Sequence, residues 1–338
     1  MERYASQLRV KALGGPQAQA RLARSQAVVV GLGATGGALA EALVRAGVGR
    51  LRLIDRDVVE LTNLHRQVLF DEADAAAGLA KAEAGAARLA RLNHEVALEP
   101  LVTDLGPDNA LELIAGADLV LDGTDNFATR LVLNDACLAR GVPWVYAGVV
   151  GTTVHGFPVV PGRTACFRCY LPELPPPGAA ETCETAGVLG PAVLVGAGFA
   201  AAEGLKLLAG GPPAEGLLVV DVWTREARRL ALPRDPDCAA CAGRYEHLAA
   251  PGQREVRLCG RDAVMLRAPG SSAPDLVRLA GRLEGLGRLE ARGRHLLRFV
   301  PARDEGHTLT VFADGRAIVS GTQDPARARS LYARWVGS

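Results

Sequence analysis

Four of the seven cysteines stand in two C-x-x-C pairs, Cys166/Cys169 and Cys238/Cys241. Each pair places two thiols on one tight turn, and four thiolates complete the tetrahedral coordination of a structural Zn²⁺ ion, with no position open for water. Because 69 positions separate Cys169 from Cys238, the metal would join segments that are distant in sequence. Four reduced core cysteines, or one redox pair, are the alternative. Two C-x-x-C pairs by chance would be unusual at this cysteine content, so the pattern predicts one zinc ion per chain.

A glycine-rich motif, VVVGLGATG, follows a short apolar run near the N-terminus, with glycines at Gly31, Gly33 and Gly36. Such a turn between a strand and a helix lets the backbone approach a phosphate at the helix N-terminus. Asp55 ends the next predicted strand, where an acid binds the ribose hydroxyls of a nucleotide. This motif most often binds NAD or FAD, so an NAD(P)-dependent oxidoreductase is one hypothesis. The paired cysteines, however, are not part of the usual dehydrogenase pattern.

Further polar residues after Asp55 favour a different chemistry. Arg66 would add a planar cation beside the phosphates, Lys81 follows on the next helix, and Asp125 lies just past a strand end, where it can hold Mg²⁺. Such a set suits phosphoryl or nucleotidyl transfer, because cations and Mg²⁺ stabilise the charge that develops on phosphates. The predicted nucleotide-binding residues are Gly31, Gly33, Gly36, Asp55, Asp57, Asn63, Arg66, Gln67, Lys81, Asp125 and Asn126.

Composition limits the classes of partner. The net charge is +1, and the 38 basic and 37 acidic residues are interleaved, so neither nucleic acid nor an anionic membrane is an expected partner. Apolar runs such as residues 191–209 are broken by glycines and charges, which argues against a membrane span. An odd cysteine count suits a reducing cytoplasm better than a disulfide framework. We therefore expect a cytoplasmic protein.

The first part of the chain alternates between apolar strands and amphipathic helices. This order predicts an α/β fold with a doubly wound, Rossmann-like, mostly parallel sheet, whose ligand lies beyond the carboxyl ends of the strands. The predicted strands are 26–31, 50–55, 96–100, 117–122, 142–149 and 217–222, and the predicted helices are 36–46, 80–92, 108–115, 130–140 and 192–208. The proline-rich stretch 171–184 is expected to be a mobile surface crossover.

The pattern divides the chain into two domains, residues 1–248 and 254–338. The second is predicted as a small α+β module in the order β-α-β-β-β-α. Its predicted strands are 255–267, 293–300 and a hairpin over 307–320 that turns at Asp314–Gly315, and its helices are 274–286 and 325–336. It contains no rhodanese-like cysteine loop, and its residues indicate no chemistry.

Taken together, the motifs resemble the MoeB/ThiF family, the bacterial relatives of ubiquitin-activating enzymes. The resemblance spans about residues 1–243. It rests on R-Y-x-x-Q at 3–7, GLGATG, D-x-D at 55–57, NLHRQ at 63–67, Lys81, TDN at 124–126 and the two C-x-x-C pairs. It implies an enzyme that binds Mg-ATP and adenylates the C-terminal glycine of a small ubiquitin-like sulfur carrier, of the MoaD or ThiS type and ending in Gly-Gly, with release of pyrophosphate.

The resemblance also implies residue roles. The glycine loop and Asp55 would hold the nucleotide, and the carrier's own carboxylate would be the nucleophile, so no protein general base is required. Cys183 matches the family cysteine that forms a covalent bond to the carrier or to sulfur, although an incidental surface cysteine is about equally compatible with the sequence. The predicted catalytic residues are Arg66, Lys81, Asp125 and Cys183.

The implied partners are a second copy of the chain, whose N-terminal segment completes the neighbouring site, and a sulfurtransferase or cysteine desulfurase. The family commonly has an arginine where this chain has Ser6, and Arg3 and Arg9 are the candidates to replace it. Ser6 also leaves a third hypothesis open, a non-catalytic scaffold that binds the carrier. The motifs are common to activators that serve the synthesis of molybdopterin, the thiazole of thiamine, thiolated tRNA and cysteine, so the pathway is not specified by the sequence.

Overall fold

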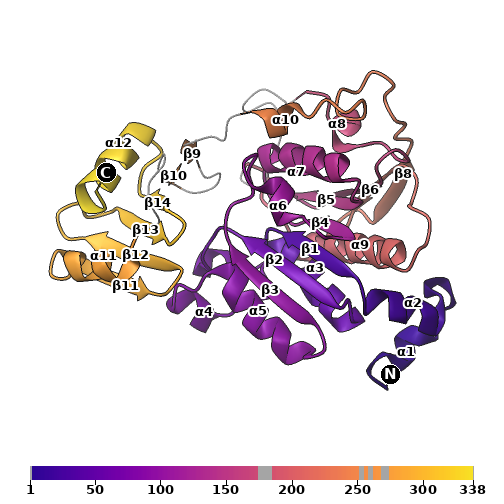
Figure 1. The fold of residues 1–338 in the computed structure, drawn as a ribbon, viewed down its shortest axis with the longest axis horizontal. Coiled ribbons are helices and arrows are strands. Elements are labelled where there is room, and N and C mark those ends of the chain that lie inside the picture. The colour runs from indigo at the N-terminus through magenta and orange to yellow at the C-terminus, as the bar shows by residue number, and fades with distance from the viewer. Residues whose placement is uncertain (1, 174–184, 251–254, 258–261, 268–273, 338) are drawn as a thin grey trace. The chain divides into compact units, whose positions relative to one another are not determined.

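A computed structural model describes residues 2–173, 185–250, 255–257, 262–267 and 274–337 (Figure 1). The chain forms two compact units. The first comprises Met1–Asp57, Leu61–Asp71 and Lys81–Pro251, and the second comprises Val58–Glu60, Glu72–Ala80 and Gly252–Ser338. Two short segments before residue 81 thus group with the C-terminal part of the chain. The predicted crossover at 171–184 lies largely outside the described residues.

The first unit contains an eight-stranded sheet in the order β3-β2-β1-β4-β5-β6-β7-β8. Neighbours from β3 to β5 are parallel, and the later pairs are antiparallel. The Rossmann-like, mostly parallel sheet that the sequence predicts is therefore confirmed, but β6 and β8 were not predicted. The strands are β1 Gln26–Val30, β2 Arg50–Asp55, β3 Ala97–Val102, β4 Leu119–Asp122, β5 Trp144–Val150, β6 Thr153–Val159, β7 Leu217–Asp221 and β8 Glu226–Leu230.

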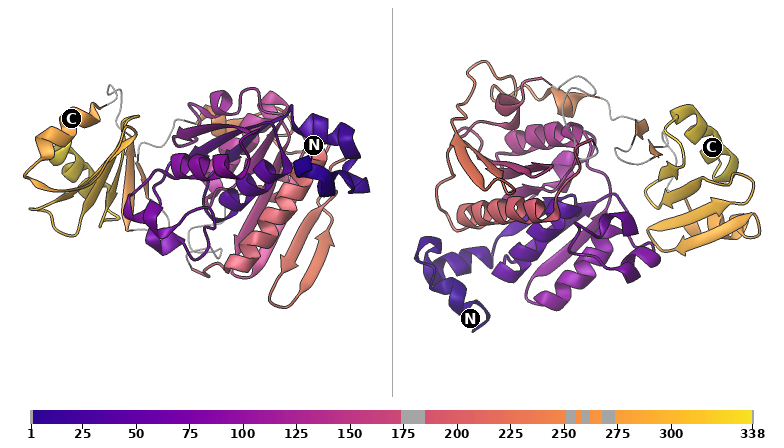
Figure 2. Two further views of the ribbon diagram at one scale, coloured as in Figure 1. Left: turned by 90° about the horizontal axis from the view of Figure 1, so that it is seen from below. Right: turned by 180° about the vertical axis from the view of Figure 1, so that it is seen from behind.

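Helices cover both faces of this sheet (Figures 1 and 2). Those on one face are α3 Ala34–Ala46, α5 Lys81–Leu92 and α9 Gly190–Leu208, and those on the other are α6 Ala110–Leu113, α7 Phe127–Arg140 and α10 Glu246–Ala249. The shorter helices of this unit include α1 Ala5–Leu8, α2 Gly15–Leu22 and α8 Phe167–Tyr170, whereas α4 Glu72–Ala76 belongs to the second unit.

Helix α9 is long and apolar enough to cross a membrane by length and composition alone. It packs on β4, β5 and β6 of the first unit. Gly204 allows the close approach, since a Cβ atom there would lie 2.9 Å from the Leu119 side chain.

The second unit contains a six-stranded antiparallel sheet in the order β11-β12-β13-β14-β10-β9 (Figure 2). The α+β class of this module is as predicted, but the predicted element order was wrong. The single strand expected over 255–267 is two strands, and a further strand, β11, follows the first helix. The elements are β9 Glu255–Arg257, β10 Ala263–Arg267, α11 Leu276–Leu283, β11 Gly287–Arg292, β12 Leu296–Pro301, β13 Thr308–Phe312, β14 Arg316–Ser320 and α12 Pro325–Trp335.

Side-chain caps fix where the two helices of this unit begin. The carboxylate of Asp275 accepts hydrogen bonds from the backbone N–H groups of Val277 and Arg278, and that of Asp324 accepts one from Ala326. Such caps satisfy amides that have no partner within the helix. The apolar faces of α11 and α12 then pack against one face of the sheet, around the fully buried Phe299.

Candidate functional site

The glycine-rich loop joins β1 to α3 and lies directly against the turn between β4 and α7. Gly31 has a φ of +83°, and a Cβ atom at this residue would lie 2.7 Å from the carbonyl oxygen of Gly123. A Cβ atom at Gly36 would collide with the carbonyl oxygen of Gly31. Because α3 begins at Ala34, its first amides lack intrahelical partners and mark an anion site at the carboxyl edge of the sheet.

Asp55 ties this loop to the end of β2. It is 7% exposed, and its two carboxylate oxygens accept hydrogen bonds from the backbone amides of Leu32 at 2.6 Å and Asp57 at 2.7 Å. Burial raises the pKa of Asp55 above its ordinary value, and the nearby Lys81 ammonium opposes that rise. Carboxylate oxygens have two lone pairs each, so Asp55 can accept further bonds from a ligand hydroxyl.

Lys81 begins α5 and is almost completely buried. Its ammonium lies 3.8 Å from the carboxylate of Asp57, and its backbone amide donates to the Asp57 carbonyl at 2.9 Å. The predicted residues Asp55, Asp57 and Lys81 therefore form one charged group. A second predicted pair lies in the segment after Asp57: the Arg66 guanidinium donates to the Asn63 side-chain oxygen at 2.7 Å.

Gln67 supplies a polar atom for which the described protein provides no partner. Its side chain is 4% exposed, and its Oε1 atom is buried without a hydrogen bond. The amide lies against the glycine loop, with Nε2 3.7 Å from the place where a Cβ atom of Gly33 would be. An unpaired buried amide oxygen costs free energy, so this position fits a ligand that donates a hydrogen bond.

The turn after β4 contains the last two predicted residues. Asp125 is exposed, and Asn126 caps α7 by accepting from the backbone amide of Thr129 at 2.9 Å. The Asn126 side-chain nitrogen also donates to Asp125 at 3.4 Å. Asn126 therefore has a structural task that the sequence pattern did not indicate, while Asp125 presents a carboxylate that can bind a cation.

Two arginines at this edge of the sheet were missed. Arg56 forms an ion pair with Asp104 at 3.2 Å. Burial lowers its pKa, but the carboxylates of Asp57, Asp104, Asp125 and Asp55 outweigh that effect and raise the pKa above its ordinary value. The position of Arg56 between two acids, Asp55 and Asp57, is the feature of the sequence that could have indicated this residue. The second missed residue is Arg130, whose guanidinium forms an ion pair with Asp122. A basic residue on the buried side of α7 is the feature of the sequence that could have indicated it.

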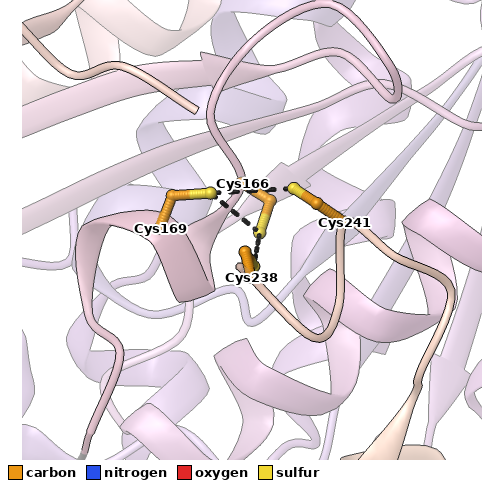
Figure 3. Close-up of side chains that lie close together, drawn as sticks. All are labelled: Cys166, Cys169, Cys238 and Cys241. Atoms are coloured by element: carbon orange, nitrogen blue, oxygen red, sulfur yellow. Dashed lines mark hydrogen bonds between the residues drawn. The ribbon is translucent and has the colours of Figure 1, made fainter. Parts of the chain in front are cut away.

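The four predicted zinc ligands form a second, separate cluster (Figure 3). Their sulfur atoms all lie within 4.8 Å of one another, with 3.8 Å between Cys166 and Cys169 and 3.6 Å between Cys169 and Cys241. A tetrahedral Zn²⁺ with sulfur bonds of about 2.3 Å requires sulfur separations of about 3.8 Å. The cluster therefore has the size and donor chemistry of a zinc site.

The surroundings of the cluster explain how it forms. Cys166 is the N-cap residue of α8 and Cys169 lies within that helix, and the second pair lies on the turn at 238–241. Burial raises the pKa of the Cys166 thiol, so a bound metal would displace protons from the site. Cys137 is fully buried in the core, as expected, whereas Cys183 and Cys259 lie outside the described residues.

Comparison with known proteins gives consistent matches. The ThiF family profile matches residues 4–240. The sulfur carrier protein ThiS adenylyltransferase of Bacillus subtilis is 40% identical over 328 residues, which is 96% of each chain. The sulfur carrier protein adenylyltransferase of Thermus thermophilus is 39% identical over 76% of this chain and 94% of its own length. The pig adenylyltransferase and sulfurtransferase MOCS3 is 43% identical, but the match spans 53% of that protein.

A solved structure of Escherichia coli MccB with ATP has a TM-score of 0.63 and 24% identity, over 71% of this chain and 74% of that one. This likeness supports the fold of the first unit. With the family profile covering most of the chain and the Bacillus relative covering nearly all of it, the chain belongs to the ThiF family.

Proposed function

We infer that this protein is an ATP-dependent adenylyltransferase that activates the C-terminal glycine of a ubiquitin-like sulfur carrier. The observation that carries this conclusion is the 40% identity, over 96% of both chains, with a relative named as a ThiS adenylyltransferase. The clustered charges beside the glycine loop suit this reaction. The oxidoreductase hypothesis has no comparable support.

The nucleotide fits the carboxyl edge of the parallel strands. We propose that the glycine loop and the first amides of α3 hold phosphates, because the backbone approaches closely there and the helix dipole favours negative charge. Asp55 would accept from the ribose, as would the unpaired oxygen of Gln67. Asn63 would position Arg66 and contact the ribose and phosphates with it.

The reaction needs charge stabilisation rather than a base. The carboxylate oxygen of the carrier attacks the α-phosphorus, the bond from that phosphorus to the bridging oxygen breaks, and pyrophosphate leaves. Arg66 and Lys81 would stabilise the charge that builds up on the phosphates. Asp125 would hold Mg²⁺, which when bound neutralises phosphate oxygens.

The carrier is proposed to be of the ThiS type. The Bacillus relative shares the C-terminal unit with this chain, since its match extends over 328 residues. The matches to the Thermus and pig relatives cover 76% and 72% of this chain, and the family profile ends at residue 240. A unit shared with a ThiS-activating relative favours that carrier over the MoaD type. The chain would act in the cytoplasm, with sulfur supplied by a separate sulfurtransferase or cysteine desulfurase.

A homodimer is proposed from the family resemblance and from the surface of α9. Leu194 and Val195 on this helix are 49% and 42% exposed, which is unusual for adjacent large apolar side chains and suits burial against a second copy. In the N-terminal segment, Arg3 donates to the Leu92 carbonyl of its own chain. The backbone amide of Arg9 donates to the Ser6 carbonyl, but its exposed side chain forms no hydrogen bond or ion pair with another described residue. Arg9 is therefore the candidate to reach the neighbouring site in place of Ser6.

Carrier-dependent exchange between ATP and pyrophosphate tests the proposed function. We expect rapid exchange with a ThiS-type carrier and Mg²⁺, and none after the last glycine of the carrier is deleted. Exchange that is slower with ThiS than with a MoaD-type carrier would contradict the carrier assignment alone. Carrier binding without any exchange would instead support the non-catalytic scaffold.

Arg66 and Cys183 should affect different steps. Arg66→Ala removes a cation that stabilises the phosphates, so exchange should fall roughly 10²–10³-fold. Cys183→Ala should leave exchange nearly intact and abolish only a covalent carrier adduct or a later sulfur-transfer step. Full exchange in Arg66→Ala would show that this residue does not contact the reacting phosphates, and loss of exchange in folded Cys183→Ala would place the thiol in adenylation.

The cysteine cluster should contain one zinc ion per chain. Metal analysis of freshly purified, unchelated protein should give close to one equivalent. Cys238→Ser should lower the zinc content well below one and lower the midpoint of thermal unfolding, because metal binding stabilises the fold. Cys137→Ala, which removes a buried cysteine outside the cluster, is the control and should keep its zinc. Zinc-free wild-type protein of normal stability would refute the assignment.

Mixed dimers test whether Arg9 acts on the partner's site. Arg9→Ala and Lys81→Ala proteins should each be nearly inactive, but mixing them should restore about a quarter of the wild-type exchange, since half of the random dimers contain one complete site. Arg3→Ala is the matched control and should remain active. Absence of recovery in dimers shown to have exchanged subunits would exclude a role in trans.

A further inference from the structure

Arg130 lies inside the first unit and holds the turn that leads to Asp125. Its side chain is 9% exposed, and its Nε atom donates to the fully buried Asp122 at 2.9 Å. Its Nη2 atom donates to the carbonyl oxygen of Thr124, the residue immediately before Asp125. One guanidinium therefore bridges the end of β4 and the last backbone oxygen before the exposed carboxylate.

Asp122 holds the same turn from the other side. Its Oδ1 atom accepts from the backbone amide of Thr124 at 2.8 Å and from the Thr124 hydroxyl at 2.6 Å. Burial lowers the pKa of Arg130, but Asp122, Tyr146 and Asp125 together outweigh burial and raise the pKa above its ordinary value, so the guanidinium stays charged. Both polar groups of the Thr124 backbone are thus fixed by this one ion pair.

The turn has little freedom to move toward the glycine loop. A Cβ atom at Gly123 would lie 2.6 Å from the Cα atom of Gly36 and would collide with the carbonyl oxygen of Gly31. The loop blocks the turn on one side and Arg130 holds it on the other. A change at Arg130 would therefore shift the direction of Asp125 without removing any group from the phosphate cradle.

Aromatic rings explain why this position suits arginine rather than lysine. The guanidinium carbon lies 5.1 Å from the ring centre of Tyr146 and 5.8 Å from that of Phe127. A planar guanidinium can lie against rings and donate to two acceptors at once, whereas a lysine ammonium is a compact point charge on a flexible stem. The site therefore depends on the planar, forked geometry of the guanidinium more than on its charge.

The energetics point the same way. A buried ion pair is weak evidence for stability, because removing two charges from water costs about as much as their attraction returns. The ion pair between Arg130 and Asp122 instead fixes the conformation of the turn between β4 and α7. We propose that Arg130 is a positioning residue that directs the Asp125 carboxylate toward the nucleotide-bound divalent cation. This proposal rests on the proposed role of Asp125.

Two variants test this role. Arg130→Lys keeps the charge opposite Asp122 but loses the fork. Asp122→Asn/Arg130→Met removes both charges together and keeps the test available if the first variant does not fold. Arg52→Lys is the matched control, because Arg52 also bridges a carboxylate, that of Glu99, and backbone carbonyls, but far from Asp125 in the sequence.

The measurement is the binding of Mn²⁺, followed by electron paramagnetic resonance, in the presence of a non-hydrolysable ATP analogue. We expect Mn²⁺ affinity to fall about 10–100-fold in the Arg130 variants, the usual effect of losing a group that orients a metal ligand. Affinity for the metal-free nucleotide should stay within about twofold of wild type, because the phosphate cradle is unchanged. Arg52→Lys should change neither quantity.

Three results separate the possibilities. Unchanged Mn²⁺ affinity in a folded Arg130 variant would overturn the positioning role. A parallel loss of nucleotide and Mn²⁺ affinity would also overturn it, because Arg130 would then support the fold in general. If Asp125→Asn itself leaves Mn²⁺ affinity unchanged, the proposed metal role of Asp125 fails, and the inference about Arg130 fails with it.

Discussion

Backbone-to-backbone contact between the glycine loop and the β4–α7 turn is the constraint on which the candidate site depends. Glycines at 31, 36 and 123 are required there, because a Cβ atom on any of them would strike backbone atoms of the others. This contact fixes the ends of β1 and β4 relative to each other and sets where α3 begins. Asp55 extends the constraint to β2 by holding the Leu32 amide, so three adjacent strand ends share one geometry.

Much of this arrangement could be predicted because its signals are local in sequence. Buried parallel strands are nearly continuous apolar runs, and the glycine spacing and the acid at the end of β2 mark a nucleotide-binding edge. The cysteine cluster could also be predicted, because each C-x-x-C pair supplies half of its thiols. What brings the two halves together is tertiary: the Asp235 amide, beside the second pair, donates to the Cys169 sulfur. Asn134 on α7 accepts from the Phe167 amide and thereby holds α8, which contains Cys169.

The features that were missed depend on contacts between distant segments. Strand β6 contains Gly156 and Pro158, which usually interrupt strands, yet Gly156 is needed where the Phe199 ring of α9 packs against the sheet. Strand β8 has no apolar alternation, because all five of its residues are exposed on the last strand of the sheet. In the second unit, β11 alternates between half-buried and exposed residues and includes three charges, so its sequence is equally compatible with a surface turn.

In helix α7, the periodic pattern of apolar residues does not indicate which polar residues have a structural role. Asn126, Arg130 and Asn134 recur every fourth residue and so lie on one side of the helix. The side of a helix usually carries either apolar side chains that pack in the core or polar side chains that face solvent. Asn126 binds the first turn of α7, Arg130 binds the turn before Asp125, and Asn134 binds the Phe167 amide next to Cys166. Arg130 and Asn134 are buried, and buried polar groups cost free energy unless their hydrogen bonds are complete. We therefore interpret these side chains as fixing the positions of the segments that they contact. They place the two candidate sites on one rigid element.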